Sequence, residues 1–193
     1  MDDMNRIEWD EFFMWTARLI SMRSVCLHYK VGVIFTKGNK IVSGGYNGPP
    51  KGEVHCAKVG CAREDRSGNK LPAGSGLCRG AHAEVNAVYN SASMGGVSLK
   101  DTVVFCTYSP CYSCAKHLVN LGIKEFVYEL DYDNNEEATR VAELFMRQGI
   151  GRRKFVPPDD VLKEIMNRYL GNYSTDEIMA ILGRPELELG IKT

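Results

Sequence analysis

The chain has 193 residues, of which 44% are hydrophobic and 25% charged, proportions typical of a soluble globular protein and not of a disordered one. Its 24 lysines and arginines balance 24 acidic residues, so no net charge favours binding to nucleic acid or to an anionic membrane. No stretch approaches the ~20 apolar residues that span a bilayer, and the acidic N-terminus is unlike a signal peptide. These features predict one domain of a cytoplasmic protein that binds neither membrane nor nucleic acid.

The seven cysteines add a constraint on the chemistry. Seven is an odd number, and thiols stay reduced in a cytosol, so disulfides are not expected. The cysteines are therefore predicted to be metal ligands or buried thiols.

The first half of the chain predicts a helix, a hairpin and a long loop. Apolar positions recur with helical spacing over 10–23, with Asp10 as the expected N-cap. Two β-branched runs, Val31–Phe35 and Lys40–Tyr46, flank a Gly-Asn turn and indicate a β-hairpin. Residues 47–80 are rich in glycine, proline and charge and have no period, so this loop is expected to be functional or held by a ligand.

Strand and helix patterns alternate in the second half. The expected order is helix 81–94, strand 102–107, helix 111–121, strand 125–130, helix 136–148 and strand 154–156. This order predicts βαβ crossovers, and therefore an α/β fold whose partly parallel sheet carries helices on both faces. The domain is assigned to 1–156, and a helical appendage with a capping box at Ser174 and Glu177 is expected over 157–193.

One histidine and two cysteines form a candidate zinc site. Cys111 and Cys114 belong to a Cys-x-x-Cys at the start of a helix, where the helix N-terminus stabilises thiolates. His82, in a His-x-Glu at the start of another helix, supplies a third ligand. Three protein ligands leave a position for water, as in catalytic zinc sites, whereas structural zinc usually has four. Glu84 is placed to accept the proton of that water.

Taken together, these motifs resemble the zinc-dependent cytidine deaminase superfamily, which carries His-x-Glu and Pro-Cys-x-x-Cys. Further segments resemble the deoxycytidylate (dCMP) deaminases, especially phage and bacterial members: Gly45–Pro50, His82–Ala87, Tyr108–Cys111, Leu121–Lys124 and Asp131-Tyr132. The resemblance covers about residues 8–156. It implies a three-layer α/β/α fold with a mixed five-stranded sheet.

For activity, the resemblance implies hydrolysis of dCMP to dUMP and ammonia, in which zinc activates water for attack on C4 and Glu84 moves protons. It also implies that Asn47 contacts the sugar, that Tyr132 contacts the nucleotide, and that the Ser109 backbone receives the amino group. From the residues alone, a turn residue is the alternative for Asn47, and for Tyr132 a packing role is equally plausible.

A phosphate site and regulation are implied as well. Arg23, Ser24 and Lys30 lie in a segment that family members bring over the pocket, and they are candidates for binding the phosphate. Family members are typically homohexamers, activated by dCTP and inhibited by dTTP, and Mg²⁺ would accompany the triphosphate effector. The effector site is expected to include Gly45, Tyr46, Asn47 and Gly48. A phage-encoded member would work in the host cytoplasm.

The remaining cysteines suggest a second metal. A structural zinc bound by four ligands would offset the ordering entropy of the long loop, and some phage and bacterial relatives carry a second zinc in this region. Unliganded buried thiols are the alternative, and His55 could replace one sulfur. Cys106, inside an apolar strand, is expected in the core. The candidate ligands are Cys26, Cys56, Cys61 and Cys78.

Three other interpretations remain open. A Cys-x-x-Cys alone is also typical of redox pairs, but that gives no role to His82 and Glu84. A zinc-stabilised interaction module would give Glu84 no function. An assay for released amine distinguishes such a module from an enzyme. A nucleic-acid deaminase of the tRNA-adenosine type shares the zinc motif, but the zero net charge favours a free nucleotide, and a gel-shift with RNA separates the two.

Overall fold

The computed structural model describes residues 6–65, 67–69, 71, 77–132, 135–158 and 161. The chain divides into two compact units, Met1–Pro157 and Pro158–Thr193, and nearly all the described residues belong to the first. The capping box at Ser174 lies outside the described residues, as does almost all of the expected appendage. Its helical character therefore stays a prediction.

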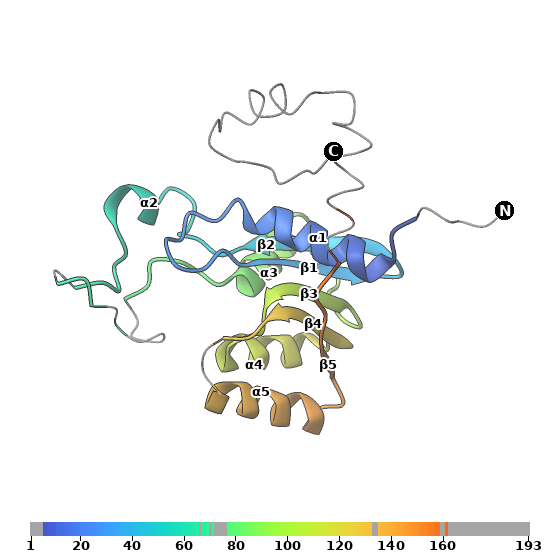
Figure 1. Ribbon diagram of the computed structural model, residues 1–193. Helices are drawn as coiled ribbons and strands as arrows, with labels where there is room; N and C mark the ends of the chain where they lie inside the picture. The colour runs from blue at the N-terminus through green and yellow to red at the C-terminus, as the bar shows by residue number, and fades with distance from the viewer. Residues whose placement is uncertain are drawn as a thin grey trace, which may run out of the picture. The chain divides into compact units, whose positions relative to one another are not determined.

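The described part of the chain contains a five-stranded mixed sheet as its middle layer (Figure 1), which confirms the predicted fold class. The strand order is β2-β1-β3-β4-β5, with β1 (Gly32–Lys37) antiparallel to β2 (Lys40–Tyr46) and to β3 (Val103–Tyr108). β4 (Glu125–Leu130) and β5 (Gly151–Lys154) continue the sheet in parallel. The parallel half follows from the βαβ connections, because each crossing helix returns the chain to start the next strand in the same direction.

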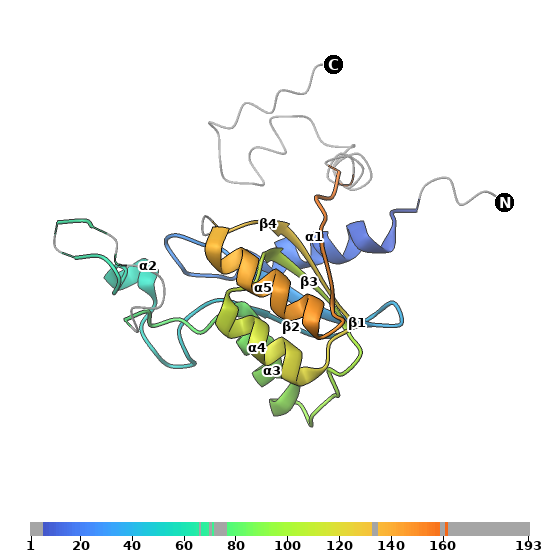
Figure 2. The same cartoon turned by 90° about the horizontal axis from the view of Figure 1, so that it is seen from below.

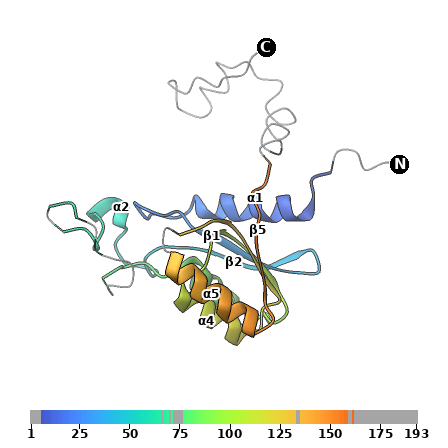
Figure 3. The same cartoon turned by 60° about the horizontal axis from the view of Figure 1, so that its bottom comes forward.

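One face of the sheet is covered by α1 (Trp9–Ser21), which lies along it in Figures 1 and 3. Every second residue of a strand points to the same face, so one set of strand side chains meets this helix. The contacts are made by Phe13, Met14 and Ala17 of α1 with Ile34, Phe105 and Val127 of the sheet.

The opposite face is covered by three helices, α3 (Ala83–Ser93), α4 (Tyr112–Leu121) and α5 (Asn135–Arg147), seen in front of the sheet in Figure 2. The alternate strand residues point to this side and form the larger core, in which Cys106 is fully buried as expected. Among the described residues, no helix is long and apolar enough to cross a membrane.

Two local expectations are wrong. α1 begins at Trp9 and its N-cap is Glu8, whose backbone N–H donates to Glu11, while Asp10 lies inside the helix and pairs with Arg153 at 2.7 Å. The last strand is β5 at 151–154, not 154–156. Its residues are Gly-Arg-Arg-Lys, so it has no apolar pattern, and pairing with β4 determines where it runs.

The loop 47–80 contains one turn of helix that the sequence pattern did not predict, α2 (Cys56–Val59), which stands apart from the sheet in Figure 1. Four residues are too few to show a helical period.

The contact between β2 and α3 is close at Gly45. A Cβ atom there would lie 2.5 Å from the backbone nitrogen of Ala87 and 2.7 Å from the carbonyl oxygen of Ala83. Hydrogen bonds on either side hold the two elements together: the Ser43 hydroxyl donates to Ala87 O at 2.7 Å, and the Asn86 amide donates to Tyr46 O at 2.8 Å. Glycine at position 45 is therefore required by packing, and it sets the position of α3.

We predict that Gly45→Ala lowers the free energy of unfolding by about 1–3 kcal/mol, because the added methyl group forces backbone atoms of α3 and β2 apart. Chemical denaturation measures this loss. Gly48→Ala is the matched control, since the nearest atom to its added Cβ lies 3.9 Å away. Equal stability of the Gly45→Ala variant and the wild type would contradict the close contact.

Candidate active site

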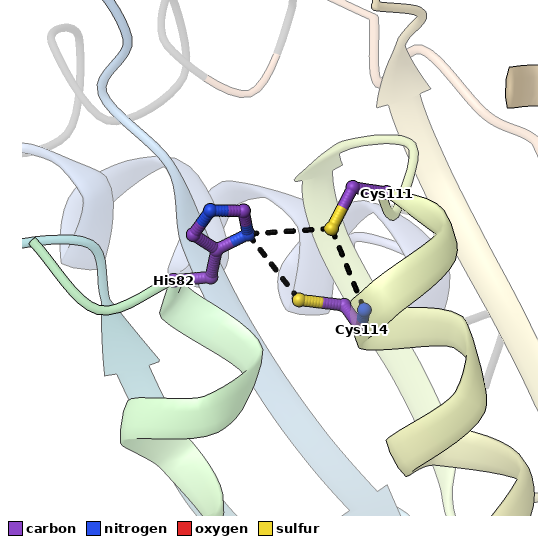
Figure 4. Close-up of side chains that lie close together, drawn as sticks. All are labelled: His82, Cys111 and Cys114. Carbon is purple, nitrogen blue, oxygen red and sulfur yellow. Dashed lines mark hydrogen bonds between the residues drawn. The ribbon is translucent and has the colours of Figure 1, made fainter. Parts of the chain in front are cut away.

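Two helix starts bring the predicted metal ligands together. His82 is the N-cap of α3, and Cys111 is the N-cap of α4. The His82 Nδ1 atom lies 3.4 Å from the Sγ of Cys111 and 3.3 Å from the Sγ of Cys114, as Figure 4 shows. The backbone N–H of Cys114 also donates to the Cys111 sulfur at 3.4 Å. The three donor atoms thus face one point, as the motif spacing predicted.

This donor set fits zinc. With Zn–S bonds of about 2.3 Å and a Zn–N bond of about 2.05 Å, tetrahedral geometry places nitrogen and sulfur about 3.6 Å apart. The observed distances of 3.4 and 3.3 Å are close to that separation. One imidazole and two thiols are ligand types that zinc prefers.

The two thiols and the imidazole shift one another's pKa values. The pKa of Cys111 is lowered to about 4, first by its hydrogen bond with Cys114 and then by His82. The same contact with Cys111 raises the pKa of Cys114, and the pKa of His82 is raised to about 9, chiefly by its hydrogen bond to Cys111. Two adjacent thiolates repel each other, and a cation bound between them would offset this repulsion.

Glu84 lies in the first turn of α3 and is 6% exposed. Burial is the main cause that raises the pKa of its carboxyl group, and the positive charge of His82 acts in the opposite direction. Glu84 lines the same pocket as His82 and Cys111, a cavity of about 410 Å³. A carboxylate in this position can exchange protons with a molecule bound at the metal.

Aromatic side chains form one wall of the pocket. The Tyr132 ring packs 5.6 Å from Tyr29 and 5.2 Å from Tyr108, measured between ring centroids, and both Tyr29 and Tyr132 line the cavity. Burial raises the pKa of Tyr132, so it stays a neutral phenol. The rings of Tyr29 and Tyr132 are inclined at 71° to each other, so they give the pocket an angled aromatic wall, against which another aromatic ring can pack.

Asn47, the predicted sugar contact, lines the pocket and has a fixed side chain. Its Nδ2 donates to the carbonyl of Tyr29 at 2.9 Å, and its Oδ1 accepts from the N–H of Val31 at 2.9 Å. These two bonds hold the loop after β2 against the segment before β1. The carboxamide is therefore oriented before any ligand binds.

Ser109 is 3% exposed and holds the end of β4 in place. Its N–H donates to the carbonyl of Leu130 at 2.7 Å, and its hydroxyl accepts from the N–H of Tyr132 at 3.2 Å. The side chain of Ser109 thus positions Tyr132, a role that sequence reasoning did not predict.

Some predicted residues lie elsewhere. Arg23, Ser24 and Lys30 are described but are not among the residues lining the pocket, and Ser24 is buried, with its hydroxyl accepting from Cys26 N. Gly45 and Tyr46 are likewise absent from the lining residues.

Among the lining residues with polar side chains, three were not anticipated: Tyr29, Arg63 and Glu137. For Glu137 the signal was present in the sequence. Glu137 lies in the first turn of the helix after β4. The helices that follow parallel strands start at the same edge of the sheet. Arg63 and Tyr29 lie in irregular segments without helical or strand periodicity, so sequence spacing does not indicate where their side chains point.

The four cysteines predicted to bind a second zinc do not form one group in the described structure. Cys26, Cys56 and Cys78 line the pocket, whereas Cys61 lies with His28 and Glu64, with donor atoms of all three within 4.8 Å of one another. His28 Nε2 and Glu64 Oε1 are 2.7 Å apart. All seven cysteines are in described residues, and their thiols are free.

A model of the cytidine and deoxycytidylate deaminase zinc-binding region matches residues 7–130, which include every ligand of the candidate zinc site. The chain belongs to this deaminase family. The resemblance recognised in the motifs is thereby confirmed. The match to a zinc-binding region and the grouping of His82, Cys111 and Cys114 both support zinc as the metal.

Relatives of this deaminase include deoxycytidylate deaminases. The enzyme of Schizosaccharomyces pombe is 32% identical over 160 residues, covering 80% of this chain but 46% of the relative, so the chain spans about half the length of that protein. The human enzyme is 36% identical over 153 residues, covering 78% of this chain and 82% of the relative. A crystal structure of dCMP deaminase from cyanophage S-TIM5, in complex with dCMP and dUMP, superposes with a TM-score of 0.62 at 30% identity, covering 78% of this chain and 99% of the other.

Proposed function

We propose that this deaminase hydrolyses dCMP to dUMP and ammonia with the help of a zinc ion. The observation that carries the proposal is the buried Glu84 carboxylate in a pocket of about 410 Å³ beside the three-ligand set. Relatives named deoxycytidylate deaminase, and the cyanophage structure that holds dCMP and dUMP, support this choice of substrate.

The chemistry requires one acid–base group and an activated water. Zinc held by His82, Cys111 and Cys114 would polarise water for attack on C4 of the cytosine ring. A Glu84 oxygen accepts one proton of the attacking water and gives it to N3 of the ring. It then takes the second proton of that water, from the hydroxyl group now on C4, and gives it to the amine, which leaves as ammonia. The overall reaction consumes one water, and Glu84 returns to its starting state.

The other pocket residues bind and orient the nucleotide. In the proposal, the fixed Asn47 carboxamide contacts the sugar, the Tyr132 wall packs on the nucleotide, and the Ser109 backbone receives the amino group. Arg23, Ser24 and Lys30 remain the proposed phosphate ligands, and Arg63 on the pocket wall is a further cation for that group. A cytoplasmic location is part of the same proposal.

We predict that the purified protein converts dCMP to dUMP and that Glu84→Gln lowers kcat by ~10²–10⁴-fold, because the amide cannot carry the proton. Zinc content should be unchanged, since Glu84 is not a ligand. Glu136→Gln, an exposed charge-matched control, should keep wild-type activity. Wild-type protein loaded with zinc that releases no ammonia from dCMP would remove the proposed function.

Regulation by nucleoside triphosphates is a second part of the proposal. The Gly45–Gly48 segment is linked to the metal ligands, because Gly48 and Ala81 exchange two backbone hydrogen bonds of 3.1 and 2.9 Å, and Ala81 precedes His82. Asn47 on the same segment faces the pocket. An effector that moves this segment, with Mg²⁺ on its phosphates, would therefore act on both the sugar contact and His82.

The expected result is that dCTP lowers and dTTP raises the apparent KM for dCMP, in a homohexamer and through competition for one site. Allosteric coupling of about 1–3 kcal/mol corresponds to a change of about 5–150-fold. Titration of each nucleotide against dCMP turnover, with the mass of the assembly measured in parallel, tests this. A confirmed hexamer that responds to neither nucleotide would refute it.

A second, structural zinc is the third part of the proposal, with ligands drawn from Cys26, Cys56, Cys61 and Cys78. What supports it is that Cys26, Cys56 and Cys78 line one cavity, whereas Cys61 lies in a separate group of donor atoms with His28 and Glu64. We predict two zinc ions per chain, falling to one in Cys61→Ser and staying at two in Cys106→Ala, whose thiol is in the core. One zinc ion in freshly purified protein with reduced thiols would exclude this second site.

A further inference from the structure

The helices α4 and α5 pack against each other and start at the same edge of the sheet, because each follows a parallel strand (Figure 2). Glu137 lies in the first turn of α5, and its Oε1 accepts the backbone N–H of Tyr112 at 2.8 Å. Tyr112 is the first residue of α4 and directly follows the metal ligand Cys111. A carboxylate of one helix thus caps the start of the helix that carries the Cys-x-x-Cys.

The first N–H groups of a helix have no partner within it. In α4 one of them, on Cys114, donates to the sulfur of Cys111, and another, on Tyr112, donates to Glu137. The peptide that joins Cys111 to Tyr112 is therefore held from outside the helix. Because a peptide group is planar, fixing its N–H also fixes the adjacent ψ angle of Cys111, which is 163°. That angle sets the direction of the Cys111 side chain relative to α4.

The ring of Tyr112 is held by the same neighbour. The guanidinium carbon of Arg140, one turn after Glu137 on α5, lies 4.2 Å from the ring centroid. The ammonium of Lys116 lies 5.5 Å from the same centroid. Tyr112 is thus attached to α5 at its backbone and at its side chain, which limits movement of the start of α4 away from α5.

We propose that Glu137 is a positioning residue for the metal site: its hydrogen bond to Tyr112 holds Cys111 in the orientation that binds zinc. The inference rests on the zinc site of the proposed function. Groups outside the ligand set that orient ligands change metal affinity or activity by ~10–100-fold when they are removed. Glu137 also lines the pocket, so it lies beside the site whose ligand it orients.

Two variants of the zinc-loaded full chain separate the hydrogen bond from the charge. Glu137→Ala removes both, whereas Glu137→Gln removes the charge and keeps an oxygen that accepts a hydrogen bond. Glu136→Ala is the matched control, because Glu136 is exposed and lies in the same turn of α5. The readout is the rate at which zinc is released to a chromogenic chelator, which needs no substrate.

We expect Glu137→Ala to release zinc ~10–100-fold faster than the wild type. Glu137→Gln should stay close to the wild-type rate, and Glu136→Ala should not differ from it. In the cobalt-substituted protein, the thiolate-to-metal absorption should change in Glu137→Ala and be restored in Glu137→Gln. A general effect on folding would change the unfolding temperature of the metal-depleted protein as well, and we expect that to move little.

Three results would overturn the inference: wild-type zinc release from Glu137→Ala, equal acceleration in the Ala and Gln variants, or the same acceleration in Glu136→Ala. The second of these would assign the effect to charge alone. Failure of the wild type to deaminate dCMP would count against the proposed function and not against this inference, because zinc release is measured without substrate.

Discussion

The approach of one imidazole nitrogen to two cysteine sulfurs is the contact on which the rest of the site depends. Each donor comes from the start of a helix, and each helix is positioned by the strand beside it. α3 packs closely against β2 because Gly45 has no side chain at the contact. α4 starts shortly after the end of β3. A shift of either helix would separate donors that are 3.3 and 3.4 Å apart, so the packing of the sheet determines whether the metal binds.

The charges of the site explain why Glu84 is suited to moving protons. In the proposed site two thiolates would balance the charge of a zinc ion, so the metal would not add a net positive charge that keeps the nearby carboxyl group ionised. Glu84 is buried, and burial raises its pKa toward the range in which a carboxyl group both accepts and donates a proton. Tyr29 and Tyr132 add aromatic side chains to the wall of the same pocket.

The accuracy of the sequence prediction differs between elements for physical reasons. The helices with a clear apolar period, such as α1 and α4, were placed to within a few residues, because burial on one face requires that period. β5 was misplaced because its charged residues carry no burial pattern and only its pairing with β4 defines it. The loop cysteines were predicted as one group from composition, yet Cys61 lies with His28 and Glu64, since an irregular chain has no spacing rule that sets where a side chain points.

The sequence by itself determined the family and the candidate site residues, because His82, Glu84, Cys111 and Cys114 stand in the His-x-Glu and Cys-x-x-Cys motifs at the starts of two helices. It also determined the parallel half of the sheet, since alternating strands and helices connect in one way. Only the tertiary structure decided which side chains from other segments meet these residues: the Ser109 hydroxyl at Tyr132, the Asn47 amide at Tyr29, and Glu137 at the start of α4. These contacts join residues far apart in the chain, and their geometry depends on how the layers pack rather than on any local pattern.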